Sequence, residues 1–277
     1  MTILVTGATG NVGRLVVDHL RAAGAPVRAL TKNPRKAALP GDVEVIEGYL
    51  GELDTLPPAF EGVERMYLAP LPETVRDVVE MAKTAGVREI VALSQTEVES
   101  EAENDESEWH YYAIEKAVED SGLEWTFLRV GQFFINALDW AEQIRSDGAV
   151  KGAYGGATYT PIALDDIAAA AAATLLQDGH RGKKYMLTGP EALAKTDMVR
   201  IIGEVVGIDI RFEEQTREEA YKSMYEAGWS EGADWMLDLE AKATENPEVV
   251  LPTFEQITGR GAVTFAEFIA EHADKFR

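Results

Sequence analysis

The sequence predicts an α/β protein with a doubly wound parallel sheet and a smaller C-terminal lobe. Three observations predict this class. A short apolar strand at residues 3–6 runs into a glycine-rich turn and an amphipathic helix. Further apolar runs then alternate with helical patterns, and such βαβ units build parallel sheets through right-handed crossovers. After about residue 135 the pattern changes to helices with a few short strands.

The elements follow from apolar, β-branched runs for strands and from 3.6-residue periodicity for helices. The first half is expected to form strands at 3–6, 27–31, 43–47, 65–69, 89–94 and 126–130, with helices near 13–23, 57–60, 72–85 and 111–121. The second half is expected to form helices at 139–146, 164–176, 196–206, 217–227 and 264–273, with short strands at 184–187 and 208–213. We therefore expect a main domain over residues 1–135, completed by later return segments, and a smaller interleaved lobe over 136–277.

The glycine-rich turn between the first strand and helix predicts a dinucleotide site. Gly7 permits a tight turn, Gly10 allows the backbone to approach a pyrophosphate, and Gly13 allows the helix to pack closely on the sheet. The helix N-terminus then presents its free N–H groups to the phosphates. The remaining contacts expected in this turn are Thr9, Asn11 and Val12. The alternative is a strand–helix turn that binds no ligand.

The end of the second strand favours NADPH over NADH. An NAD site usually offers an acid there to the ribose diol, whereas this chain has Thr31 followed by cations. Lys32 and Arg35 are the expected partners of the 2′-phosphate, with Thr31 as a hydrogen-bond donor. The alternative is that these residues only solvate the surface.

Other site residues are expected where the later strands end, because ligands bind at the carboxyl ends of such strands. The further cofactor contacts expected there are Leu68, Ala69, Pro70, Gln95 and Gly131. Ser94 is expected to hydrogen-bond a substrate carbonyl or to cap a turn. Gln132 and Phe133 are expected to contact the nicotinamide or substrate, or to pack in the core. Trp229 belongs to an aromatic, methionine-rich cluster expected to cover an aromatic substrate or to form a helical core.

Composition excludes several classes of function. The chain has no Cys, which rules out disulfide frameworks, thiolate catalysis and Cys-ligated zinc or iron–sulfur sites. The net charge of −22 argues against nucleic acid and anionic membranes as partners. The acidic run 97–108 is expected to be a solvated loop. With no room for a signal peptide and no apolar run long enough to span a membrane, we expect a cytoplasmic protein without a metal site.

The chain resembles the NmrA-like branch of atypical short-chain dehydrogenases/reductases. The matching segments run in family order over nearly the whole chain and are 6–13, 27–34, 61–63, 121–129, 165–168, 185–190 and 257–260. The resemblance implies a Rossmann-type domain, an NADP(H) site and a small substrate lobe. Relatives include quinone and azo reductases, ketoreductases and redox-sensing proteins. Tyr49 replaces the usual acid near the adenine, which suggests stacking, and Val130 replaces the family's proline before Gly131.

The proton donor is harder to predict. Tyr112 and Lys116 have the Tyr-x-x-x-Lys spacing that many short-chain dehydrogenases use. If Ile114 and its neighbours form the buried stripe, however, that pair falls on the opposite helix face. The inward-facing His110 and Tyr111 are therefore the expected proton donors or substrate-stacking residues. Their alternative role is packing.

Together these features predict an NADPH-dependent oxidoreductase that transfers hydride from nicotinamide C4. The expected substrate is a quinone or a carbonyl of an aromatic or polycyclic molecule, and the expected state is a monomer or homodimer. The main alternative is a non-catalytic NADP(H)-binding redox sensor that regulates a protein partner. A third, weaker possibility is an isomerase or dehydratase that uses a bound cofactor.

Overall fold

The computed structural model describes residues 2–99, 111–229 and 232–277. Its contacts divide the chain into two compact units. Unit 1 comprises Met1–Val130, Leu164–Leu187 and Thr253–Arg260. Unit 2 comprises Gly131–Ala163, Thr188–Pro252 and Gly261–Arg277. Each unit is therefore assembled from segments that are far apart in the sequence.

Unit 1 is built on a parallel sheet with the strand order β3-β2-β1-β4-β5-β6-β9. Every pairing in it is parallel. The strands are β1 (Thr2–Val5), β2 (Val27–Thr31), β3 (Glu44–Glu47), β4 (Val63–Leu68), β5 (Glu89–Gln95), β6 (Glu124–Val130) and β9 (Lys183–Leu187). From β1 the chain adds β2 and β3 on one side of the sheet, and it then returns to add β4, β5 and β6 on the other side. This reversal in strand order places a topological switch point between β1 and β4.

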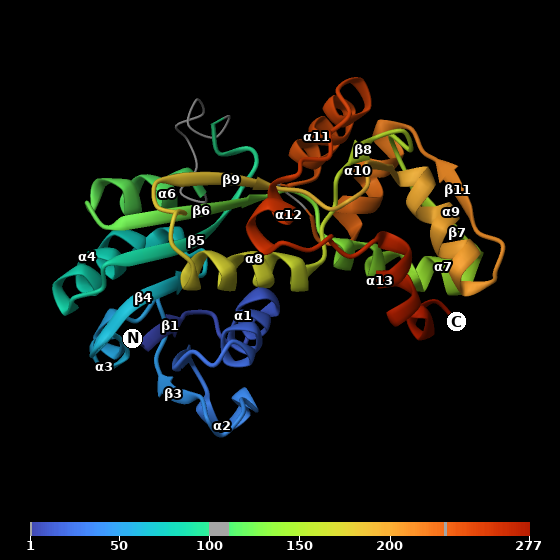
Figure 1. Cartoon of the computed structure of the whole chain (residues 1–277). Helices are drawn as coiled ribbons and strands as arrows, with labels where there is room; N and C mark the ends of the chain where they lie inside the picture. Colours follow the sequence, from blue (N-terminus) through green and yellow to red (C-terminus); the bar gives the residue numbers. More distant parts are fainter. Residues whose placement is uncertain (1, 100–110, 230–231) are drawn as a thin grey trace. The chain divides into compact units, whose positions relative to one another are not determined.

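Helices cover both faces of this sheet (Figure 1). Helices α1 (Asn11–Ala22) and α8 (Leu164–Leu176) pack together on one face, and α4 (Val75–Ala85) and α6 (Tyr111–Asp120) pack together on the other. The shorter helices of the unit are α2 (Pro34–Ala37), α3 (Pro57–Phe60) and α12 (Thr253–Thr258), with 3-10 turns η1 (Leu53–Thr55) and η2 (Pro72–Thr74). The strands carry side chains alternately to both faces and are apolar on both, as buried parallel strands require. Met66, Ile90 and Phe127 belong to the core beneath α4 and α6.

The predicted doubly wound parallel sheet is confirmed. All six strands expected in the first half are present, with bounds that differ by at most two residues. The helix expected at 72–85 is divided into a 3-10 turn and α4. Helices α2 and α12 were not predicted. Later return segments and a short strand at 184–187 were expected, but that strand was not assigned to the main sheet. It is β9, which pairs with β6 at the edge.

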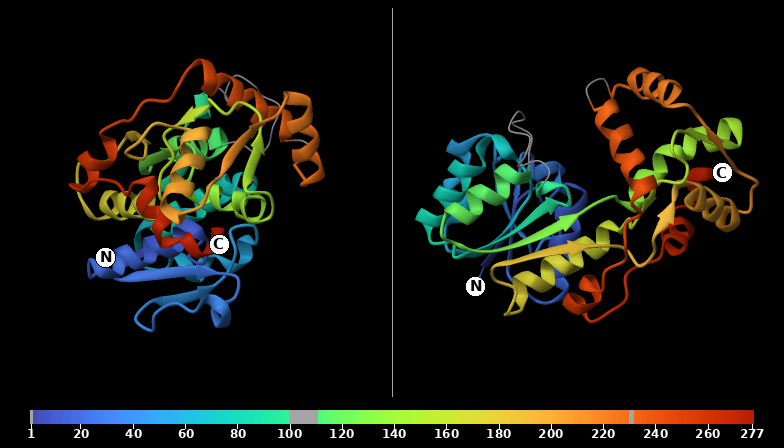
Figure 2. Two further views of the ribbon diagram at one scale, coloured as in Figure 1. Left: turned by 90° about the vertical axis from the view of Figure 1, so that its right-hand side faces the viewer. Right: turned by 90° about the horizontal axis from the view of Figure 1, so that it is seen from above.

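Unit 2 is mainly helical (Figure 2). Its helices are α7 (Ala141–Asp147), α9 (Lys195–Val206), α10 (Arg217–Glu226), α11 (Ala233–Glu245) and α13 (Phe265–Glu271), with 3-10 segments η3 (Phe134–Trp140) and η4 (Ala273–Phe276). Two small sheets accompany them: β7 (Ala149–Gly152) with β11 (Arg211–Glu214), and β8 (Thr158–Tyr159) with β10 (Leu193–Ala194). The main core joins η3, α7, α9 and α13, with Phe134 and Phe265 at its centre.

Local capping signals explain where two of these helices begin. Thr216 caps α10 and Thr264 caps α13, and each accepts a hydrogen bond from the backbone N–H three residues later. In both cases the glutamate at that position binds back to the capping residue, which is the capping-box arrangement. The sequence analysis predicted these two helices but missed α11, β7, β8 and β10.

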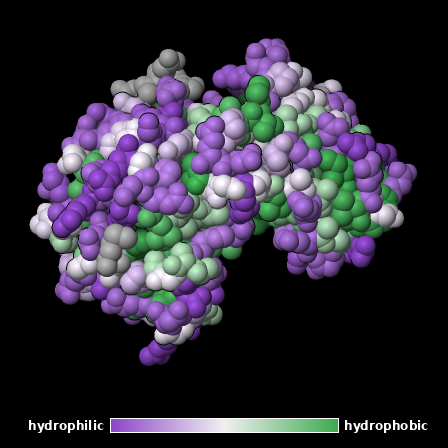
Figure 3. Space-filling view, viewed as in Figure 1, coloured by the Kyte–Doolittle hydropathy of each residue, from purple (hydrophilic) through white to green (hydrophobic). Residues whose placement is uncertain are grey.

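The surface is mostly hydrophilic on the face seen in Figure 3, with separate apolar patches. Within the described residues, every helix is too short or too polar to cross a bilayer.

Candidate cofactor site

The glycine-rich turn adopts the geometry that a phosphate-binding loop needs. Gly7 has φ +59°, a left-handed conformation that favours glycine. Its carbonyl oxygen accepts a hydrogen bond from Gly10 N at 2.8 Å. A Cβ atom at Gly13 would lie 2.2 Å from that same oxygen. Gly13 is therefore required for α1 to approach the turn, and the helix N-terminus with its unpaired N–H groups begins directly beside it.

Thr6 ties the turn to the neighbouring strand β4. Its buried hydroxyl donates to Tyr67 O at 3.0 Å and accepts from Ala69 N at 2.8 Å. A Cβ at Gly7 would lie 2.8 Å from the Cβ of Ala69, so the two loops pass in close contact. The carboxyl ends of β1 and β4 are thus held together at the switch point of the sheet.

A cavity of about 450 Å³ opens at the carboxyl ends of β1, β2 and β4 within unit 1. It brings together six residues expected from sequence: Gly7, Thr9, Thr31, Lys32, Ala69 and Pro70. Tyr49, which was expected near the adenine, also lines the cavity. The lining residues that were not predicted from the sequence are Leu30, Asn33, Lys36, Ala37, Gly48, Leu50 and Leu71. Gly10, Asn11, Val12 and Gly13 form the adjoining turn and helix start, and Leu68 is the buried last residue of β4.

The cationic loop after β2 supplies positive charge to this cavity. Lys32 Nζ lies 3.3 Å from the centroid of the Tyr49 ring, a cation–π contact. That ammonium therefore occupies one face of the ring on which adenine stacking was expected. Lys36 also lines the cavity, whereas Arg35 is exposed and does not. Lys36 lies close in sequence to Lys32 and Arg35, and this proximity was the signal that could have identified it.

The geometry around Ser94 corrects its predicted role. Ser94 is fully buried and its hydroxyl donates to Glu115 Oε1 at 2.6 Å. Arg129 donates to both oxygens of the same carboxylate, each at 2.8 Å, and also to Glu99 at 2.7 Å. The hydrogen bonds that Arg129 donates to Glu115 raise the pKa of Arg129 above its ordinary value. Ser94 thus joins β5 to α6 and β6 and presents no surface to a substrate.

Helix α6 has the rotation that the sequence analysis expected. Ile114 is buried, Tyr112 is 41% exposed, and Lys116 binds Asp120 at 2.6 Å on the solvent side. The residues of the Tyr-x-x-x-Lys spacing therefore face outward. Tyr111 is partly buried and packs against the core of unit 1. His110 lies outside the described residues, as does most of the acidic run 97–108.

The residues predicted to contact substrate separate into two groups. Gln132 and Phe133 line a cavity of about 90 Å³ within unit 2. Trp229 is 48% exposed and is not among the residues that line this cavity. Gln95 is the last residue of β5, and Gly131 follows β6 directly.

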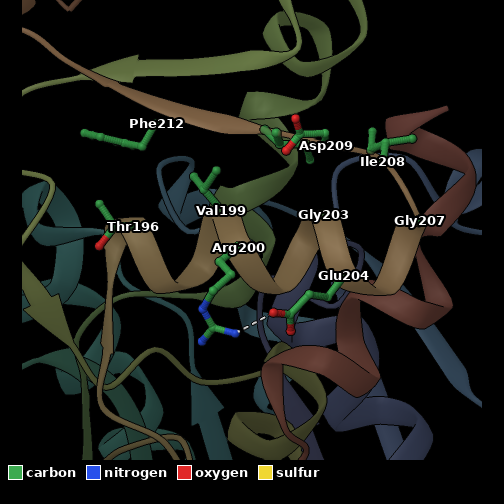
Figure 4. Close-up of a pocket in the computed structure, with 10 residues that line it drawn as sticks. Thr196, Val199, Arg200, Gly203, Glu204, Gly207, Ile208, Asp209 and Phe212 are labelled. Carbon is green, nitrogen blue, oxygen red and sulfur yellow. Dashed lines mark hydrogen bonds and ion pairs between the residues drawn. The ribbon is translucent and has the colours of Figure 1, made fainter.

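A shallow hollow of about 640 Å³ runs along α9 in unit 2 (Figure 4). Its wall combines Val199 and Ile208 with an Arg200–Glu204 ion pair at 2.9 Å. Both charges of that pair are already matched, and the hollow carries no chemistry suited to a redox cofactor. No cluster of His, Cys, Asp or Glu suited to a metal ion occurs in residues 2–99, 111–229 and 232–277.

The residues of the cavity in unit 1 fit the adenosine and diphosphate end of a dinucleotide. The glycine turn and the start of α1 suit the diphosphate, and Lys32 and Lys36 suit an additional phosphate. Thr9 and Thr31 meet across the cavity, with their hydroxyl oxygens 3.4 Å apart.

Comparison with known proteins agrees with this geometry. The model of a family described as NAD(P)H-binding matches residues 7–178. The (4-alkanoyl-5-oxo-2,5-dihydrofuran-3-yl)methyl phosphate reductase of Streptomyces griseus is 38% identical, with 99% of each chain covered. The NAD(P)H azoreductase of Xenophilus azovorans is 34% identical, also over 99% of each chain. The NADPH complex of Escherichia coli quinone oxidoreductase QOR2 superposes with a TM-score of 0.84 at 26% identity, covering 98% of this chain and 99% of that one.

Proposed function

This chain belongs to the NAD(P)H-binding family, and on that premise we propose that it is an NADPH-dependent reductase of quinones or of carbonyls in aromatic small molecules. The observation that supports NADPH as the cofactor is the cavity where the glycine turn meets Lys32 and Lys36. The reduction itself is supported by relatives over the full length that are named as reductases.

Different residues of unit 1 bind different parts of the cofactor. Backbone N–H groups at the start of α1 bind the diphosphate, and Gly10 and Gly13 keep side chains out of its path. Lys32 binds the 2′-phosphate and so favours NADPH over NADH. When bound, the nicotinamide supplies the hydride, and one proton from solvent or a side chain completes the two-electron reduction.

We propose Tyr111 as the side chain that donates the proton. Water and the substrate's own hydroxyl are the alternative proton donors. Tyr111→Phe is expected to lower kcat by about 100-fold, the low end for general acid catalysis, because it removes the phenolic proton. Tyr112→Phe, one residue away on the exposed side of α6, is the matched control and should retain nearly full activity. A larger loss in Tyr112→Phe would reverse the assignment, and the pH profile of kcat separates loss of an acid from loss of packing.

The reductase itself is tested by NADPH oxidation at 340 nm against quinones, azo dyes and aromatic ketones, with binding of NADPH and NADP⁺ measured alongside. Turnover with a member of the panel establishes the activity and narrows the substrate class. Tight binding of cofactor without any turnover would refute it and favour the redox sensor.

A further inference from the structure

Unit 2 contains a small cavity with a mainly apolar wall. It is about 90 Å³ and is enclosed by residues of η3, β8, α9 and α11. Phe133, Trp140, Met198 and Met236 supply the apolar part. Aromatic and thioether side chains of this kind suit a flat ring, because they offer polarisable surface without competing hydrogen bonds.

One side chain that lines this cavity carries a polar group with no hydrogen-bond partner among the described residues. Tyr159 is only 6% exposed, and its hydroxyl is buried without a hydrogen bond to any described residue. Such groups are rare, because leaving a buried hydroxyl unpaired costs free energy. Burial, followed by the negative charges of Glu240 and Glu248, raises the pKa of Tyr159. The hydroxyl therefore keeps its proton at neutral pH and acts as a donor.

The two charges in the same wall cancel one another. Lys195 Nζ lies 2.7 Å from Glu240 Oε1 and donates a second hydrogen bond to Ala153 O at 2.8 Å. Both side chains are largely buried, at 12% and 14% exposure. The pair leaves the cavity without net charge, so a charged ligand would be desolvated there without a free counter-charge.

We propose that this cavity receives the uncharged, oxygen-bearing edge of the reducible substrate, and that the Tyr159 hydroxyl donates a hydrogen bond to that oxygen. This inference rests on the proposed reductase activity and names the residue that selects the substrate. A cavity of about 150 Å³ holds benzene, so the smaller volume here takes one edge of a ring and its carbonyl.

The test is Tyr159→Phe in the full-length protein, with Tyr221→Phe as the matched control. Tyr221 lies in a separate small core of the same unit and is not among the residues lining the cavity. Tyr159→Phe is expected to lower kcat/KM for 1,4-benzoquinone by about 3- to 10-fold, the effect of one hydrogen bond. The Kd for NADPH should stay within about twofold in both variants. Thermal stability should be unchanged or higher in Tyr159→Phe, since no protein hydrogen bond is lost.

Unchanged kcat/KM in Tyr159→Phe, or an equal loss in Tyr221→Phe, would overturn the assignment. Should the wild-type protein turn over no acceptor, the reductase proposal fails by itself, and the cavity is then tested by calorimetric titration with acetophenone. Binding that weakens about threefold or more in Tyr159→Phe supports the cavity as a carbonyl site. No binding, or equal binding to both proteins, refutes it.

Discussion

Replacing Lys32 with alanine is expected to weaken NADPH binding and leave NADH binding nearly unchanged. Lys32 lies in the cavity at the end of β2, with its ammonium 3.3 Å from the centre of the Tyr49 ring. The cation–π contact confines an otherwise flexible side chain, so less entropy is lost when a phosphate binds. NADH lacks the 2′-phosphate and gains little from this charge.

The expected size follows from the exposure of the site. Lys32 is exposed, so its attraction to a phosphate is screened and lies near the low end of the range for charge-assisted hydrogen bonds. About 1.5–2 kcal/mol is expected, equivalent to a 10- to 30-fold increase in Kd for NADPH. The effect should shrink as salt is added, because the interaction is largely electrostatic.

The assay is calorimetric titration of each variant with NADPH and with NADH. Arg35→Ala is the matched control, because it removes a cation from the same loop but outside the cavity lining. Lys36→Ala removes a second cation that does line the cavity, and a smaller effect on NADPH is expected from it. Equal weakening of both dinucleotides by Lys32→Ala would show that Lys32 maintains the shape of the cavity and does not bind the 2′-phosphate. A larger effect from Arg35→Ala would equally refute the reasoning.

Three further predictions concern the turn, the buried ion pair and the partly buried His19. Gly13→Ala places a Cβ 2.2 Å from a carbonyl oxygen of the turn, so calorimetry should show both dinucleotides binding at least about tenfold more weakly. Arg129→Met leaves Glu115 buried without its bidentate partner and should lower the free energy of unfolding in urea by about 3 kcal/mol. The double variant Arg129→Met/Glu115→Leu should recover most of the lost stability. Equal stability of the single and double variants would contradict this explanation. The hydrogen bond that the protonated His19 ring donates to Asp165 raises the pKa of His19 above 6.5. The protonated ring therefore stabilises the fold below that pH, and this contribution is lost as the pH rises through the folded pKa. The stability difference between wild type and His19→Gln should be larger near pH 5.5 than near pH 9, and a larger difference at pH 9 would contradict this sign.

The parts of the fold that sequence predicted are those governed by local periodicity. The inner strands of unit 1 are short, largely apolar runs that are mostly buried, and the glycine turn needs backbone conformations that few residues adopt. The rotation of α6 was also predictable, because Ile114 and Tyr112 differ clearly in polarity. By contrast, β7 pairs with β11 across some sixty residues of chain, and that pairing has no local signature.

The site residues that sequence missed depend on contacts between distant segments. Ser94 was expected to face a substrate, but a carboxylate from α6 lies within the apolar stripe and binds its hydroxyl. Lys36 and Arg35 are adjacent, and only the short helix α2 decides which of them lines the cavity. Trp229 looked like a core or pocket residue by type, yet it is about half exposed. Residue type alone does not determine which way a side chain points.

Because the two units are interleaved in sequence, unit 1 can be completed only late in biosynthesis. The edge strand β9 and helix α8 of unit 1 come from Leu164–Leu187, and α12 comes from Thr253–Arg260. A nascent chain that ends at Val130 therefore has an open edge on β6 and an uncovered apolar face where α8 belongs. The cofactor-binding unit cannot be completed on the ribosome until nearly the whole chain has emerged. A truncated form that ends at Val130, made to isolate that unit, should therefore aggregate.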